Sequence, residues 1–282
     1  MTLYLSFRTQ RVGGSVVDPR VLQGDGTKKP LGLTLIENAL LQNYAAGKHV
    51  LFGVHGFNVS LDYGASSLGK LEAELFRSGL APNTDLFIGV LWPGDAWLPV
   101  VNYPFEGDDA MDCGRRLAGF CTRWLSSAQS LSFVSHSLGA RVVLEAVEHL
   151  ERKARVVCLT APAVNRDALT SEYSSARSQA SSISILASHS DQVLKLAYPV
   201  GDLLADILHN DHKLFQPALG YGGPPLPAAS PIQSPWQIAD REHVGHGDYL
   251  PPGDDKSHDP PKWPRPAAFM ARAFLDLPQT WP

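Results

Sequence analysis

The stretch LSFVSHSLGARVVLEA (131–146) places a serine where its hydroxyl is suited to act as a nucleophile. An apolar run typical of a buried strand ends at SHSLG (135–139), and a helical apolar pattern begins at once. Where a strand turns this sharply into a helix, the residues two before and two after the serine must be small. Gly139 meets this requirement after Ser137, and Ser135 meets it less well before it. The alternative is that Ser137 only caps the helix.

A second stretch, HGFN (55–58), follows an earlier apolar run and is suited to bind an oxyanion. An enzyme that transfers acyl groups needs two backbone N–H groups aimed at the developing negative charge. Leu138, directly after the serine, and Phe57 are the expected donors, and Gly56 allows the backbone to approach closely. The alternative is an ordinary glycine turn. We expect His55 to be a structural hydrogen-bonding residue and not a base.

A third stretch, GVLWPGDAWLPVVNYP (89–104), ends the next strand and continues as an apolar loop. Apolar loops at the carboxyl edge of a sheet either pack on the core or line a substrate pocket. The sequence favours neither alternative. If the loop lines a pocket, its candidate substrate-binding residues are Trp97, Leu98 and Tyr103.

The elements that must position these residues alternate along the chain. Strands covered on both faces have nearly continuous apolar runs, and helices on a sheet have amphipathic patterns of helical period. Strands are expected at 49–55, 85–92, 131–136, 155–160 and 182–188, with 3–7 as a further candidate, and helices at 31–47, 60–79, 110–128 and 138–151. This alternation predicts an α/β fold with a mostly parallel central sheet of about six or seven strands and helices on both faces.

The last third of the chain has a different pattern. Residues 191–215 are helical in pattern but interrupted by Pro199 and Gly201, and residues 216–237 are dense in proline and glycine, which predicts an irregular segment. Residues 266–277 are expected to form a closing helix. We interpret residues 1–282 as a single domain with an irregular insertion at about 216–237.

Composition narrows the functional classes. The 282 residues are 44% hydrophobic and 18% charged, which is ordinary for a globular protein, and the net charge of −4 gives no reason to expect a nucleic acid partner. No uninterrupted apolar window approaches the ~18 residues of a membrane-spanning helix. The N-terminus has no signal-peptide pattern, so a reducing cytoplasm is the default expectation. The three cysteines have no zinc-site spacing, and Cys113 and Cys121 are expected to pack inside the fold.

The motifs HGFNVS, LWPGD, SHSLGAR and ASHSDQVL, in that order, resemble those of the α/β-hydrolase superfamily. The chain is most similar to a bacterial branch with an HGFN-type oxyanion loop and an SHS-[LM]-G turn around the nucleophile, over about residues 48–194. The resemblance implies an α/β-hydrolase fold and a Ser-acid-His hydrolase, with ester or lipid-like substrates the commonest role. It implies no particular substrate.

The resemblance also implies the order nucleophile, acid, histidine along the chain. Asp191, just past the strand at 182–188, is the expected acid, and Asp167 is its rival. His246, between two glycines, is the expected base, followed by His243. The remaining late histidines, His209, His212 and His258, are expected to face solvent, His189 to be no base because it precedes the acid, and His136 to point away from Ser137 by strand alternation.

These residues predict a serine hydrolase that cleaves a small-molecule carboxylic ester without a cofactor. Acyl transfer or thioester cleavage by the same three residues, and a hydrolase fold used only for binding, are the alternatives. A metal site in the segment 243–259, with its three histidines and four aspartates, is disfavoured because the spacing matches no common site. The sequence leaves the oligomeric state open.

Overall fold

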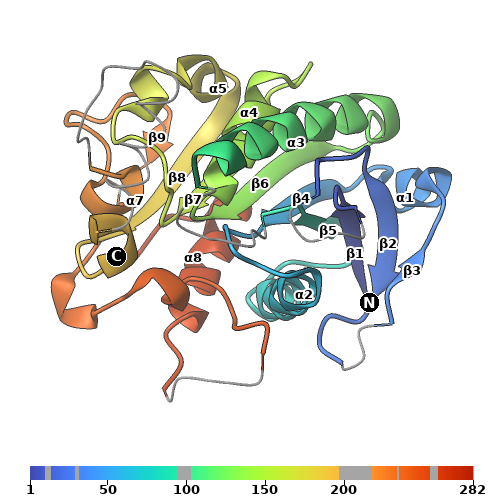
Figure 1. Cartoon of the computed structure of the whole chain (residues 1–282), viewed down its shortest axis with the longest axis horizontal. Helices are drawn as coiled ribbons and strands as arrows, with labels where there is room; N and C mark the ends of the chain where they lie inside the picture. The colour runs from blue at the N-terminus through green and yellow to red at the C-terminus, as the bar shows by residue number, and fades with distance from the viewer. Residues whose placement is uncertain are drawn as a thin grey trace.

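A computed structural model describes residues 1–9, 14–28, 32–94, 103–196, 217–233, 235–254 and 260–281. Its centre is a sheet that has ten strands within the described residues (Figure 1). Six strands run parallel to one another in the order β8-β7-β6-β4-β5-β1. They are β1 (Thr2–Ser6), β4 (His49–Val54), β5 (Asp85–Leu91), β6 (Ser130–His136), β7 (Ala154–Thr160) and β8 (Ala180–Ser188). These are the six apolar runs that the sequence indicates, so the predicted fold class is confirmed.

The sheet is wider than the expected six or seven strands because short strands extend both edges. β2 (Arg20–Gly24) and β3 (Thr34–Leu35) continue the sheet beyond β1 in antiparallel orientation, and β9 (Ile232–Gln233) and β10 (Gln237–Ile238) pair with β8. These strands have only two to five residues and no continuous apolar run, so their sequences carry no strong strand pattern.

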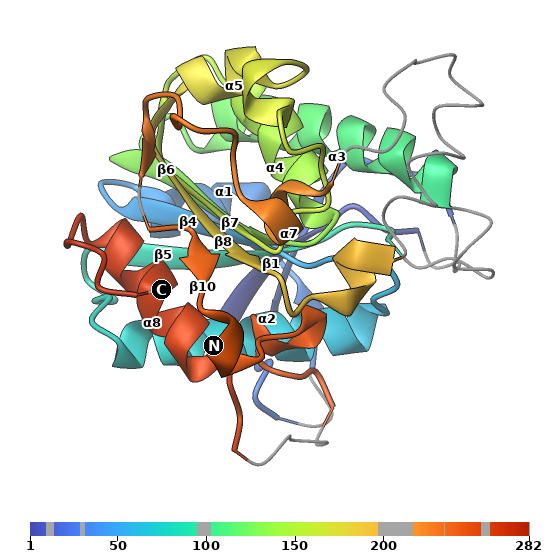
Figure 2. The same ribbon diagram turned by 90° about the vertical axis from the view of Figure 1, so that its left-hand side faces the viewer.

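Helices cover both faces of the sheet, as expected (Figures 1 and 2). One face carries α1 (Asn38–Ala45), α3 (Tyr103–Trp124), α4 (Gly139–Glu148) and α5 (Ser174–Ser178), and the other carries α2 (Leu61–Arg77) and α8 (Pro264–Phe274). α1 is shorter than the expected 31–47 because residues 34–35 join the sheet as β3. The segment expected to be irregular includes the short helix α7 (Leu219–Gly222) and β9.

The cysteines lie in the core, as the sequence predicts for Cys113 and Cys121. Cys113, Cys121 and Cys158 are all buried and free. Burial raises the pKa of each thiol, which keeps these side chains uncharged inside the core. Among the described residues, none of the helices combines the length and the apolarity needed to cross a bilayer.

The register of the parallel strands brings three loops to one edge of the sheet. Val54 of β4 pairs with Ser135 of β6, and His136 of β6 pairs with Thr160 of β7. Thr160 in turn pairs with Leu186, near the end of β8. Since the strands are parallel, the loops after β4, β6 and β8 all leave the sheet at its carboxyl edge, where open α/β sheets bind their ligands.

Candidate active site

The backbone around Ser137 has the strained geometry of a nucleophile turn. Ser137 has a φ of +54°, in the left-handed region that residues other than glycine rarely occupy. Helix α4 begins at Gly139 and its cap residue is Leu138, so Ser137 is not the helix cap that the alternative interpretation requires. A Cβ on Gly139 would lie 2.4 Å from the backbone oxygen of His55, which is far too close. The turn therefore requires a glycine at position 139.

Ser135 stands where a G-x-S-x-G pattern has its first glycine, and the structure accommodates it. The residue is only 1% exposed, and its hydroxyl has no hydrogen-bond partner among the described residues. Its backbone pairs normally with Val54 and Leu159 on the two neighbouring strands. The extra Cβ and hydroxyl thus fit without disturbing the strand, at the cost of a buried polar group.

His246 lies beside Ser137, and His243 does not take this place. Nε2 of His246 lies 2.8 Å from Oγ of Ser137, although 109 residues separate them. His246 begins a short 3₁₀ helix (His246–Asp248) directly after Gly245. His243 is exposed, has a φ of +48°, and offers its backbone oxygen to the ammonium of Lys262.

Asp191 lies on the far side of the same imidazole ring. Its Oδ2 is 2.7 Å from Nδ1 of His246, and its Oδ1 accepts the backbone N–H of Leu194 at 2.9 Å. The side chain is fully buried, and each of its carboxylate oxygens has a hydrogen-bond partner, as buried polar groups require. Asp167, the rival acid, instead precedes the short 3₁₀ helix Ala168–Thr170. A chain of hydrogen bonds from carboxylate to imidazole to hydroxyl can move a proton off the hydroxyl oxygen.

The loop that carries His246 is held by several hydrogen bonds that the sequence does not reveal. Oγ of Ser188 donates to the backbone oxygen of Val244 at 2.7 Å, and Oδ2 of Asp248 accepts the N–H of Gly245 at 2.8 Å. The ring of Tyr249 is fully buried in the core, as expected of an anchor for this loop. The loop is therefore fixed to β8 on one side of His246 and to the core on the other.

The loop after β4 packs directly against the turn at Ser137. A Cβ on Gly56 would lie 3.0 Å from Cβ of Ser137, so this glycine permits close contact between the two loops. Trp92 donates its indole N–H to the backbone oxygen of His55 at 2.8 Å, and the two rings stack. Phe57, one of the two expected oxyanion donors, directly follows Gly56, which packs on Ser137.

His55 has the structural role that the sequence predicts. Its Nδ1 donates to the backbone oxygen of Gly56 at 2.8 Å, and its other nitrogen faces the guanidinium of Arg8. Burial, reinforced by the positive charge of Arg8, lowers the pKa of His55 to about 3. The ring is therefore neutral at physiological pH and stabilises the shape of the loop.

His136 was expected to point away from Ser137, and the structure places its ring against the histidine that contacts Ser137. Its Nε2 lies 2.7 Å from the backbone oxygen of His246, and the two ring centroids are 4.8 Å apart. Alternation along β6 correctly separates neighbouring side chains, but it carries no information about the distant loop that packs on them. The only sequence signal is that His136 precedes the serine.

The predicted substrate-binding residues stay predictions. Trp97 and Leu98 lie outside the described residues, as do His209, His212 and His258 among the histidines expected to face solvent. Tyr103 is the first residue of α3.

The described part of the chain contains no group of three or more His, Cys, Asp or Glu side chains that could hold a metal ion.

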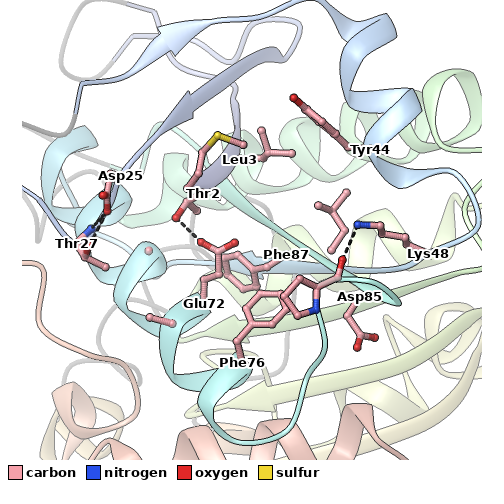
Figure 3. Close-up of a pocket in the computed structure, with 15 residues that line it drawn as sticks. Thr2, Leu3, Asp25, Thr27, Tyr44, Lys48, Glu72, Phe76, Asp85 and Phe87 are labelled. Atoms are coloured by element: carbon pink, nitrogen blue, oxygen red, sulfur yellow. Dashed lines mark hydrogen bonds between the residues drawn. The ribbon is translucent and has the colours of Figure 1, made fainter.

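A hollow of about 550 Å³ lies at the edge of the sheet where the parallel strands begin, opposite the carboxyl edge (Figure 3). It is lined by Thr2 and Leu3 at the start of β1, by Asp85 and Phe87 at the start of β5, and by Glu72 of α2. Because the lining residues of β1 and β5 are at the amino ends of these parallel strands, the length of the strands separates the hollow from Ser137. It is not part of the candidate active site.

Comparisons with known proteins place the chain in a family whose function is not known. No curated protein matches significantly. Two solved structures of phospholipase PlaB from Legionella pneumophila, one in complex with thio-NAD, are similar at 18% and 19% identity with TM-scores of 0.27 and 0.28. The matched region covers 43% and 44% of this chain, and the chain spans only 27% of each phospholipase chain. A family model described as "Alpha/beta hydrolase of unknown function (DUF900)" matches residues 36–205. The chain belongs to this α/β-hydrolase family.

Proposed function

We propose that the protein is a serine hydrolase that cleaves carboxylic esters through an acyl-enzyme intermediate. The observation that carries this proposal is the continuous chain of hydrogen bonds from Asp191 through His246 to Ser137, with lengths of 2.7 and 2.8 Å. These hydrogen bonds lie at the carboxyl edge of the sheet, and the serine that they reach has a φ of +54°. Ordinary surface serines have neither feature.

In the proposed reaction, Oγ of Ser137 attacks the ester carbonyl carbon while Nε2 of His246 takes the hydroxyl proton. Collapse of the tetrahedral intermediate breaks the bond to the leaving alkoxide, which receives that proton from His246. Water then attacks the acyl-enzyme by the same route, which releases the acid and restores Ser137. Asp191 holds His246 in the tautomer with a proton on Nδ1 and stabilises the imidazolium that forms in each half-reaction.

The backbone N–H groups of Phe57 and Leu138 are the proposed oxyanion donors. Support comes from the packing of Gly56 on Ser137 and from the position of Leu138 at the start of α4. Preorganised backbone donors stabilise the charge that develops on the carbonyl oxygen, and removal of one donor costs about 2.7–4 kcal/mol in related chemistry.

An apolar acyl group is the substrate feature that we propose, on the alternative in which the apolar loop after β5 lines a pocket. The loop with Trp97 and Leu98 and the start of α3 at Tyr103 follow β5, which also ends at the carboxyl edge. We therefore propose lipid-like esters as substrates, with acyl transfer to an alcohol or thioester cleavage as the alternative for the same three residues. The products formed from one activated ester in water and in water with added alcohol distinguish hydrolysis from transfer.

Labelling with a fluorophosphonate probe tests the proposal directly. The wild-type protein is expected to react covalently at Ser137, and Ser137→Ala is expected to remain unlabelled while keeping the wild-type melting temperature. Folded wild-type protein that does not label would favour a non-catalytic binding module. If the protein labels, p-nitrophenyl esters of increasing chain length then measure the size of the acyl site.

A further inference from the structure

We propose that His136 is a positioning residue that holds the base His246 at the nucleophile through a hydrogen bond to its backbone carbonyl. This inference rests on the proposed function of Ser137 and His246. His136, the residue before the nucleophile, connects strand β6, which ends in the nucleophile turn, to the loop that supplies the base.

The hydrogen bond fixes both the tautomer and the direction of the His136 ring. A backbone oxygen only accepts, so Nε2 of His136 must carry the proton that it donates to His246 at 2.7 Å. The neutral ring then has no proton on Nδ1. This nitrogen faces Gly56, where a Cβ would lie only 3.1 Å away. The ring is thus enclosed between the loop after β4 and the loop of the base.

The other anchors of the His246 loop cannot replace this contact. Ser188 and Asp248 hold Val244 and Gly245, which precede His246, and Tyr249 packs in the core after it. His136 alone among these described contacts holds the backbone of His246 itself, and it does so from the residue next to Ser137. His136 therefore adds a direct connection between the backbone of the base and the turn of the nucleophile, which the other anchors do not provide.

A neutral ring is also suited to the position of His136, because the neighbouring His246 becomes charged during the proposed reaction. The ring centroids of His136 and His246 are 4.8 Å apart. Burial, and next the proximity of His246, lower the pKa of His136 to about 3, so its ring stays neutral when His246 takes a proton. A cationic side chain at this place would repel the imidazolium, whereas a neutral donor orients it without that cost.

Replacement of His136 by phenylalanine, glutamine and asparagine tests the proposal. Phenylalanine keeps the ring and removes the donor. The amide nitrogen of glutamine reaches about as far as Nε2, whereas that of asparagine is one carbon shorter. Displacement of a catalytic group by about 1 Å costs on the order of 100-fold in rate, so we expect kcat to fall ten- to a hundredfold in His136→Phe and His136→Asn. KM is expected to change less than about threefold, and His136→Gln to recover most of kcat.

His149→Phe is the matched control, because Nδ1 of His149 also donates to a backbone oxygen, that of Glu145, at the far end of α4. Its kcat is expected to equal that of the wild type. A wild type that neither labels nor turns over esters contradicts the proposed function itself. An active wild type whose His136→Phe and His136→Asn variants keep kcat within twofold overturns this inference alone. If His136→Phe does not fold, a kcat of His136→Asn equal to that of His136→Gln overturns it equally.

Discussion

Asp191 and His246 are 55 positions apart, yet Oδ2 of Asp191 lies 2.7 Å from Nδ1 of His246. The carboxylate is fully buried, and its second oxygen accepts the backbone N–H of Leu194. Each oxygen of this buried carboxylate therefore has a hydrogen-bond partner in place of the water that it has lost. The geometry supports a role for Asp191 in orienting the imidazole.

Replacement of Asp191 by asparagine is expected to lower kcat on the order of 10⁴-fold without unfolding the protein. The amide oxygen still accepts the N–H of Leu194, but the amide nitrogen donates to Nδ1 of His246 and selects the wrong tautomer. The measurement is kcat on a p-nitrophenyl ester together with the melting temperature. Asp167→Asn, which changes the rival acid in the same way, is the control and is expected to keep wild-type kcat. The opposite ranking of the two variants would exclude Asp191 as the acid.

The identity of the base gives a second prediction. His246→Ala removes the group 2.8 Å from Oγ of Ser137 and is expected to reduce kcat by at least 10⁴-fold. His243→Gly is the control, since glycine accepts the φ of +48° at this position and the exposed imidazole makes no contact with Ser137. The measurements for both variants are kcat on a p-nitrophenyl ester and the rate of fluorophosphonate labelling. Slow labelling of the glycine variant at full stability would show that His243 takes part.

Much of this arrangement could be predicted because it depends on local patterns. The six parallel strands are nearly continuous apolar runs, and the sharp turn at Ser137 needs small residues at fixed distances from the serine. Asp191 follows a strand that comes after the turn, which is the place that the resemblance to α/β-hydrolases implies for the acid. The strands and the turn are determined within one segment, so neighbouring residues reveal them, whereas the acid needs the chain order of the family as well.

The rest depends on contacts between distant segments. The strands β2, β3, β9 and β10 form because an edge of the sheet is available to them, and their own sequences lack the continuous apolar run that would indicate a strand. His136 contacts a backbone oxygen 110 residues away, so its own place on β6 could indicate only the direction away from Ser137. The contact of Ser188 with Val244 spans 56 residues in the same way.

The close approach of Gly139 to His55 gives a third prediction. A methyl group at position 139 would press on the backbone oxygen of His55, which cannot rotate away as a flexible side chain could. Gly139→Ala is therefore expected to lose about 1–3 kcal/mol of unfolding free energy and most of its labelling rate, since the loop with Phe57 must move away from Ser137. Urea unfolding and probe labelling measure the two effects.

Ser135→Ala is the counterpart on the other side of the turn, and it is expected to have the opposite effect. The buried hydroxyl has no partner among the described residues, so its removal relieves an unsatisfied polar group and raises the unfolding free energy by about 1 kcal/mol. The urea midpoint should rise with an unchanged slope, and labelling should continue at the wild-type rate. A loss of stability in both variants would mean that the turn tolerates no change at all.

Glu72 gives the last prediction, which concerns stability and not catalysis. Burial raises the pKa of Glu72 from 4.5 to about 7, while the hydrogen bond from Thr2 opposes the shift (Figure 3). The folded protein therefore binds this proton more tightly than the unfolded chain, and the contribution of Glu72 to stability falls as the pH rises from about 4.5 through about 7. Glu72→Gln should melt several degrees above the wild type at pH 8 and near it at pH 4.5. Glu151→Gln, which removes an exposed carboxylate, controls for net charge. A Glu72→Gln difference that stays constant from pH 4.5 to pH 8 would contradict the raised pKa.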